Sequence, residues 1–313
     1  MIMKKIVFYF MCLMALLSYS ENGYCQLGPE YFEQAMNYHN NKDYKNAAKY
    51  FALSADYGYV WGLHFLGSYF HDGLVLPKDY EKAFQLWMAA EGRGSTNGAN
   101  EYCLGICYLK GEGVAENKVE AEKWLSKALS YAVAESTKKD AKKALTIVRN
   151  LIKAENGDAD AQWWAGSYYE DGDGVNKDPA EAVKWFRKAA EQGNASGQKS
   201  LADCYRRGKG IEKDEAEAAK WYRKAADQGH EWAQEELGEC YLEGKGVAVD
   251  KVEAVKWFRK SAEQGNKYAQ RYLGDCYLNG EGVAADKAEA VKWYKMAAEQ
   301  GDYYSEEKLK SLE

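Results

Sequence analysis

A chain of 313 residues with 46% hydrophobic and 14% aromatic side chains has ample material for a large buried core. It contains only 3 Pro, and alternating β-branched runs are nearly absent, which favours helices throughout. Its 42 basic and 48 acidic residues are finely mixed and give a net charge of -6. Because no basic stripe is present, the composition argues against a nucleic-acid partner.

The first 25 residues differ in kind from the rest of the chain. Lys4 and Lys5 precede an apolar run over residues 6–17, which is short for a bilayer span and typical of a secretory signal. We therefore expect residues 1–25 to be a signal peptide and the mature chain to have no membrane span. A lipidated Cys25 is the alternative, but the residues before it lack the leucine and small residues of such sites. The expected location is the bacterial periplasm or cell envelope.

A fixed period organises the sequence after residue 29. Trp185, Trp221, Trp257 and Trp293 each follow the previous one by 36 residues, and the segment 159–193 is the repeat from which the others vary. A chain of this length would ordinarily suggest two domains. Stacked repeats instead form one elongated array, so the period outweighs the length.

Each copy of the repeat contains the signals of two helices and a tight loop. In one copy Leu201, Ala202 and Tyr205 share a helical face, and Gly208-x-Gly210 suits a loop with positive φ angles. An Asn or Asp then precedes a Glu by three residues, a pattern that predicts a capping box at the start of the second helix. The predicted N-cap residues are Asn117, Asp178, Asp214, Asp250 and Asp286.

These motifs closely resemble the Sel1-like repeat. The resemblance rests on Leu104-Gly105-x-x-Tyr108-x-x-Gly111-x-Gly113-Val114 and on Ala182-x-x-Trp185-Phe186-x-Lys188-Ala189-Ala190-x-x-Gly193, and it covers roughly residues 59–301. It implies an all-α fold, a right-handed α-solenoid of stacked antiparallel helix hairpins. Local departures are Leu86-Trp87 for the usual Trp-Phe, Leu74 for the second loop Gly and Ala132 for the terminal Gly.

The expected organisation has six segments. Residues 1–25 are the signal peptide, 29–58 a tetratricopeptide-like first hairpin and 59–133 Sel1-like repeats 1 and 2. Residues 134–157 hold an extra amphipathic helix, whose apolar stripe includes Ala141, Leu145, Val148 and Leu151. Repeats 3 to 6 follow over 158–301, and 302–313 form a C-terminal capping helix. The extra helix is either a hinge between two subarrays or a rigid additional layer.

The sequence offers little for catalysis, and we expect no enzyme activity, cofactor or metal. Cys107, Cys204, Cys240 and Cys276 occupy one repeat position, too far apart for disulfides, and are expected to be buried core residues. Cys103 could pair with Cys107 or bind a metal, but no partner for it recurs. The resemblance includes bacterial members with two Cys per repeat. Because the second Cys is missing here, the hydrolase and penicillin-binding claims for those members do not carry over.

One face of the first helices is left for binding. Positions -5, -2, +2 and +5 from Leu201 point away from the core, and in solenoids that resemble this one they line the concave groove. Each large aromatic residue among them is either a contact site or packs against the next repeat. The predicted partner-binding residues are Trp61, His64, Tyr102, Trp163, Lys199, Arg206, Trp232, Glu235, Tyr268 and Arg271.

The resulting hypothesis is an exported, non-catalytic scaffold or adaptor whose groove binds a protein or peptide segment. The resemblance supports it, because Sel1-like proteins are typically assembly scaffolds. The alternative is a carbohydrate or peptidoglycan binder that uses Trp61, Trp163 and Trp232 as stacking platforms.

Overall fold

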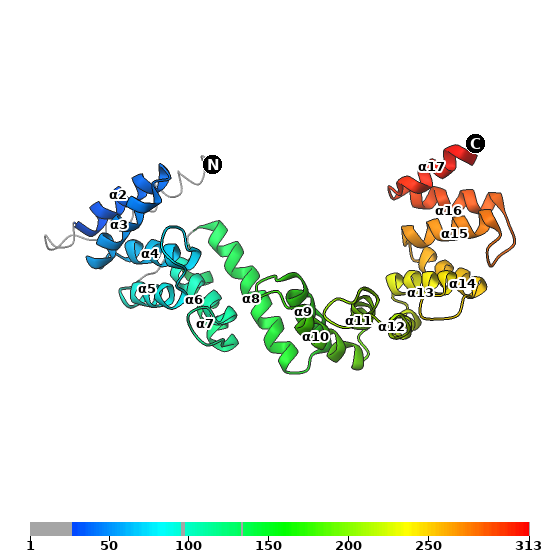
Figure 1. The fold of residues 1–313 in the computed structure, drawn as a ribbon, viewed down its shortest axis with the longest axis horizontal. Coiled ribbons are helices and arrows are strands. Elements are labelled where there is room, and N and C mark those ends of the chain that lie inside the picture. The colour runs from blue at the N-terminus through cyan, green and yellow to red at the C-terminus, as the bar shows by residue number, and fades with distance from the viewer. Residues whose placement is uncertain (1–26, 95–97, 133, 313) are drawn as a thin grey trace. The chain divides into compact units, whose positions relative to one another are not determined.

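The computed structural model describes residues 27–94, 98–132 and 134–312, and every regular element in these ranges is an α-helix. The chain divides into two compact units, residues 1–152 and 153–313 (Figure 1). The expected signal peptide, Cys25 included, lies outside the described residues. The predicted all-α fold of stacked antiparallel hairpins is confirmed where the structure describes the chain.

The described part of unit 1, which begins at residue 27 and ends at residue 152, contains three hairpins and most of a longer helix. Its helices are α2 (Leu27–Asn40), α3 (Tyr44–Asp56), α4 (Val60–Asp72), α5 (Tyr80–Gly92), α6 (Ala99–Lys110), α7 (Lys118–Tyr131) and the main part of α8 (Glu135–Glu155). The first two hairpins share a core in which Phe32, Phe51 and Tyr69 are buried and their rings contact one another. This aromatic core begins at the hairpin predicted to be tetratricopeptide-like.

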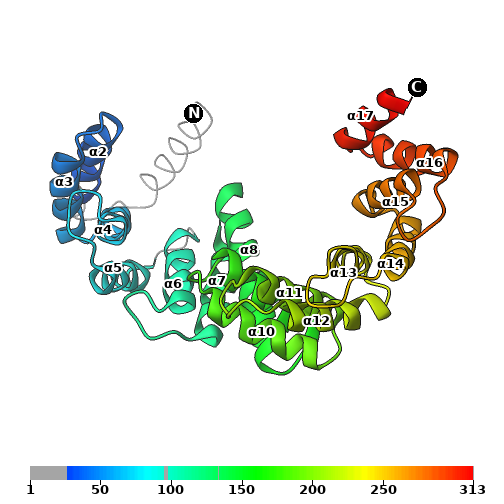
Figure 2. The same cartoon turned by 45° about the vertical axis from the view of Figure 1, so that its right-hand side comes forward.

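Unit 2, residues 153–313, repeats one hairpin four times and ends with a single helix. Its helices are α9 (Ala159–Asp171), α10 (Pro179–Glu191), α11 (Ala195–Arg207), α12 (Glu215–Asp227), α13 (Glu231–Glu243), α14 (Lys251–Glu263), α15 (Lys267–Asn279), α16 (Lys287–Glu299) and α17 (Tyr303–Leu312). Both views show each hairpin lying on the previous one, most clearly from α13 to α16 (Figure 2).

Each second helix of unit 2 buries the tryptophan that the repeat predicts. Trp221 is 9% exposed, and Tyr222 beside it is fully buried among Leu201, Ala202 and Leu237. Burying a large aromatic side chain contributes a few kcal/mol, so these positions hold consecutive hairpins together. Small residues at the facing positions make room, because a Cβ on Gly238 would lie 2.6 Å from the ring of Phe258.

The predicted N-caps are confirmed, but the reciprocal half of the capping box is wrong. Oδ1 of Asp178 accepts hydrogen bonds from the backbone N–H groups of Ala180 and Glu181, each at 3.0 Å. The backbone N–H of Asp178 donates instead to the carbonyl of Tyr169, at 2.9 Å, and Glu181 pairs with Lys184. The end of the first helix supplies the acceptor, so the glutamate is free for an ion pair. The other four repeats share this arrangement.

The second loop glycine is required by a close backbone approach. Gly210 has φ +72°, and a Cβ there would lie 2.1 Å from the carbonyl oxygen of Pro179 in the preceding repeat. The same approach recurs at Gly246 and Gly282. The loop therefore connects neighbouring repeats through the backbone itself.

The expected extra helix is α8, which runs for 21 residues. Ala141, Val148 and Leu151 of its apolar stripe are buried. On its polar side Arg149 pairs with Glu122 of α7 at 2.8 Å. The boundary between the two units falls inside this helix, after Ile152.

Candidate partner-binding face

One repeat position on the first helices connects the predicted site residues of unit 2. Trp163, Lys199, Glu235 and Arg271 are 36 residues apart and lie on α9, α11, α13 and α15. Together with Arg206, Trp232 and Tyr268, they make up what we call the first-helix face. Contacts along this face run from each first helix to the next, as the following distances show.

The predicted residues of unit 1 are held by internal contacts. His64 Nδ1 lies 2.7 Å from Asn100 Oδ1, and the ring of Trp61 meets that of His64 edge-on at 5.8 Å between centroids. Burial lowers the pKa of His64, so its imidazole is neutral near pH 7. Tyr102 is half-buried, and burial raises its pKa. These three side chains mainly pack within the unit.

The aromatic residues of the first-helix face differ from one another in exposure. Trp163 is half-buried, and its indole N–H donates to Ser200 Oγ at 3.1 Å, which connects α9 to α11. Trp232 is 42% exposed, and its ring lies 5.9 Å from that of Tyr268 on α15. Trp163 therefore packs against the next repeat, the second of the two predicted alternatives, whereas Trp232 presents a large apolar surface to solvent.

The two predicted cations of α11 already have counter-ions. Lys199 Nζ lies 2.7 Å from Asp203, and Arg206 lies 2.9 Å from Glu236 of α13 and 3.8 Å from Asp203. Tyr222 donates its hydroxyl to Asp203 at 2.5 Å. These contacts form a partly buried network between consecutive hairpins, in which both guanidinium and ammonium are neutralised.

Arg271 is engaged at the C-terminal end of the array. It lies 3.5 Å from the buried Asp302, and its guanidinium lies 5.4 Å from the ring of Tyr268, 5.1 Å from that of Tyr272 and 5.5 Å from that of Tyr304. Cation–π contacts of this kind are worth about 0.5–2 kcal/mol. Arg271 thus attaches α17 to the preceding repeat.

Glu235 has no such partner. Its side chain is 8% exposed, yet it makes no hydrogen bond or ion pair with another described residue. Burial and, to a smaller extent, the negative charges of Glu236 and Glu239 raise the pKa of Glu235 to about 8, although Arg206 and Arg271 oppose the shift. A carboxyl group is therefore held largely protonated at neutral pH on this face.

Sequence reasoning missed several residues of this face. Trp164 is 45% exposed, and its ring lies 4.6 Å from that of Trp163. Tyr304 and Asp302 belong to the last helix and its approach, which the sequence presented only as a cap. The adjacent Trp-Trp pair was a signal that could have identified Trp164. No sequence pattern points to the stacking of Tyr304 on Arg271.

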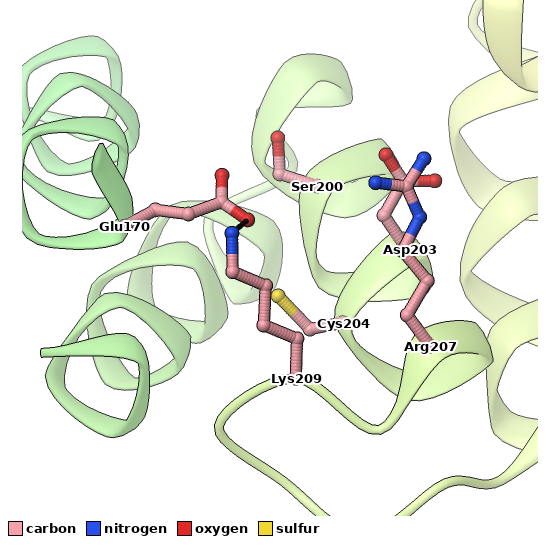
Figure 3. A pocket seen from close by; sticks show the side chains of 6 residues that line it. All are labelled: Glu170, Ser200, Asp203, Cys204, Arg207 and Lys209. Carbon is pink, nitrogen blue, oxygen red and sulfur yellow. Dashed lines mark hydrogen bonds and ion pairs between the residues drawn. The ribbon is translucent and has the colours of Figure 1, made fainter.

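A small polar hollow lies between α9 and α11 (Figure 3). Its volume is about 70 Å³, and Glu170 and Lys209 point at each other across it with a 2.9 Å ion pair. Ser200, Cys204 and Arg207 complete the walls together with Asp203. Pockets for drug-sized molecules begin near about 300 Å³, so this hollow is too small for such a ligand.

The thiols of the repeats are buried and free. Cys107, Cys204, Cys240 and Cys276 have their pKa raised to about 12 by burial, which keeps them protonated and unreactive. Within the described ranges no group of three or more His, Cys, Asp or Glu side chains is placed to hold a metal ion. No helix in those ranges is long and apolar enough to cross a membrane.

The chain belongs to the Sel1 repeat family. The family model matches residues 62–90, 101–130, 159–194, 195–230, 233–266 and 267–302, so the predicted resemblance is confirmed. Sel1 and tetratricopeptide-like repeat proteins generally mediate protein–protein interactions, and the Sel1 scaffold is generally non-catalytic. No curated protein matches the chain.

Two solved structures are similar over most of the chain. One is a protective antigen of uropathogenic Escherichia coli strains with an SLR fold, at 29% identity and a TM-score of 0.52. The match covers 91% of this chain but only 64% of the antigen. The other is a Sel1 repeat protein from Oxalobacter formigenes, at 28% identity and a TM-score of 0.51, with 91% of this chain and 87% of that one covered.

Proposed function

We propose that this protein is an exported, non-catalytic scaffold that binds a protein segment on the first-helix face of unit 2. The observation that carries the proposal is Trp232, which remains 42% exposed although every other Trp of the last three hairpins, namely Trp221, Trp257 and Trp293, is buried. Exposed aromatic residues beside paired charges are characteristic of the anchor positions of protein interfaces.

The chemistry around Trp232 supports a protein partner. Its ring neighbours Tyr268, and Glu236, four residues further along α13, is ion-paired with Arg206. An apolar anchor within a polar rim is the usual anatomy of a protein interface. The comparisons give no support to a carbohydrate partner, and the half-buried Trp163, which bonds to Ser200, presents less surface for sugar stacking.

Export is the part of the proposal that rests on the sequence alone. Lys4, Lys5 and the apolar run after them carry it, and they lie outside the described residues. Fractionation of cells that produce the full chain with a C-terminal epitope tests it. The tagged protein is expected in the periplasmic or envelope fraction, and retention in the cytoplasm would contradict export.

Site-specific photocrosslinking tests the binding face. A benzophenone amino acid placed at Trp232 of the full chain, in cells of its native host, is expected to give discrete adducts with another protein. The matched control places it at Val249, which is 59% exposed on the loop before α14. No adduct at Trp232, or the same adducts at both positions, would contradict the proposed face. Retention on purified peptidoglycan without protein adducts would favour the carbohydrate alternative.

A further inference from the structure

Glu235 is the exception in a row of paired charges. At the same repeat position, Lys199 lies 2.7 Å from Asp203 and Arg271 lies 3.5 Å from Asp302. Glu235 sits between them in repeat order, is more than nine-tenths buried and has no counter-ion among the described residues. A buried carboxyl without a partner costs free energy, so this position is not explained by stability.

The carboxylates next to Glu235 already have cations. Glu236 lies 2.9 Å from Arg206, and Glu239 lies 2.6 Å from Lys245. Tyr272 of α15 directs its hydroxyl to Glu239 at 3.4 Å. Arg206 and Arg271 act on Glu235 only from a distance, so the charge that Glu235 carries when ionised has no ion-pair partner among the described residues.

The open aromatic surface lies beside this carboxyl. Trp232 and Glu235 occupy positions i and i+3 on α13, which places their side chains next to each other on one helix face. Lys267 and Arg271 both lie 5.4 Å from the ring of Tyr268. Among the described residues none places a cation over Trp232, the ring type that binds cations best.

We propose that Trp232 and Glu235 form a receptor for one basic side chain, lysine or arginine, of the partner segment. This inference rests on the proposed function and specifies the chemistry of the partner at that face. The cation lies against the exposed indole ring and pairs with the Glu235 carboxylate. The ion pair is strengthened because the carboxyl is already removed from bulk water, and the indole ring adds a cation–π contact.

Binding of a cation at this position is coupled to release of a proton. The groups that face Glu235 are Glu236 and Glu239 on its own helix, Arg206 from α11, and Arg271 and Tyr272 from α15. Burial and the two carboxylates raise the pKa of Glu235 to about 8, so the free receptor is mostly protonated at pH 7. Only the ionised form pairs with a cation, so affinity rises as pH increases to about 8 and then levels off.

Unit 1 supplies a matched control for a buried glutamate. Glu101 on α6 is fully buried, and both of its carboxyl oxygens are sealed from solvent. Burial raises its pKa to about 7. The carboxyl oxygens of Glu235 are not sealed in this way, and an exposed Trp lies beside them.

The test uses two end-blocked pentapeptides, Gly-Ser-Arg-Ser-Gly and the same peptide with citrulline in place of arginine. Citrulline keeps the shape of arginine and removes its charge. Binding to the full chain is followed through the indole N–H resonance of Trp232, assigned with Trp232→Phe. At pH 8 the arginine peptide is expected to bind about tenfold more tightly than the citrulline peptide, the factor expected for one charge-assisted contact. Between pH 8 and pH 6 its affinity is expected to fall, by at most about tenfold per pH unit.

Three variants sharpen the outcome. Glu235→Gln is expected to bring the arginine peptide to the affinity of the citrulline peptide, whereas Glu101→Gln and Glu243→Gln leave the difference unchanged. A cooperative thermal transition and an unchanged circular dichroism spectrum show that each variant is folded. Equal affinities of the two peptides, no shift at the highest soluble concentration, or an unaffected Glu235→Gln variant would each overturn the receptor. Those results leave crosslinking at Trp232 as the separate test of the proposed function.

Discussion

The same face of the first helices differs between unit 1 and unit 2 in what its side chains contact. In unit 1 the predicted residues Trp61, His64 and Tyr102 are half-buried, and His64 is held neutral and bonded to Asn100. In unit 2 the face carries paired charges, the exposed Trp232 and the unpartnered Glu235. Recurring core residues stabilise each unit internally, so the residues of the face of its first helices can vary. Exposure and an unpaired charge, more than residue type, distinguish the proposed binding positions from the packing positions.

The largest expected effect comes from a second-helix tryptophan. Trp221→Ala removes a ring that is 9% exposed and packs among Leu201, Leu237 and their neighbours. It should lower the free energy of unfolding by about 3–5 kcal/mol, the usual cost of removing a buried aromatic residue. Urea unfolding followed by circular dichroism measures this loss. A change below 1 kcal/mol (about a third of the low end of that range) would mean that stacking does not depend on this position.

A loop glycine should give the next largest effect. Gly210→Ala adds positive-φ strain and places a Cβ 2.1 Å from the Pro179 carbonyl, so we expect a loss of about 2–4 kcal/mol. Gly229→Ala is the control, because Gly229 also has positive φ, +88°, but nothing lies within 4 Å of its Cβ. Its cost should be the strain alone, about 1 kcal/mol. Equal melting temperatures for the two variants would exclude the backbone contact between repeats as a source of stability.

The two buried glutamates, one in each unit, should make the free energy of unfolding depend on pH. The folded-state pKa of Glu101 is raised to about 7 and that of Glu235 to about 8. Protonation therefore favours the folded state. This contribution is complete below the unfolded pKa near 4.3 and is lost as pH rises through 7 and 8, respectively.

Glutamine does not ionise, so variants with glutamine at these positions do not lose this stability as pH rises. Relative to the parent, Glu101→Gln and Glu235→Gln should gain about 1.4 kcal/mol of stability per pH unit between the unfolded and folded pKa values, with little difference near pH 4. Thermal unfolding across this pH range measures the difference. It should level off near pH 7 for Glu101→Gln and near pH 8 for Glu235→Gln. A constant offset at every pH would show that these carboxyls do not titrate as described.

The smallest expected effect on stability is that of Trp232→Ala. Its ring is 42% exposed, so the free energy of unfolding should change by no more than about 0.5 kcal/mol, as for surface positions in general. Binding of the crosslinked partner should nevertheless weaken. The pairing of this variant with Trp221→Ala directly contrasts a binding tryptophan with a packing tryptophan. A large loss of stability would assign Trp232 to the core.

The sequence predicted the scaffold well because each structural requirement recurs in every copy. The 36-residue spacing of Trp185, Trp221, Trp257 and Trp293 gave the repeat, and the Asp or Asn before each second helix gave the N-cap. The sequence did not predict which group accepts the hydrogen bond from the backbone N–H of the N-cap residue. The acceptor for the Asp178 N–H is the Tyr169 carbonyl of the preceding helix, a contact that no local pattern encodes.

The sequence by itself determined the helices, the loops and which side chains are buried between hairpins, because these depend on neighbours at fixed separations along the chain. Only the tertiary structure decided which residues of the first-helix face remain available. Lys199, Glu235 and Arg271 occupy one repeat position, yet two are ion-paired and one is not. Lys199 pairs with Asp203 four residues along its own helix, whereas Arg271 reaches Asp302 only because the turn before α17 lies beside α15.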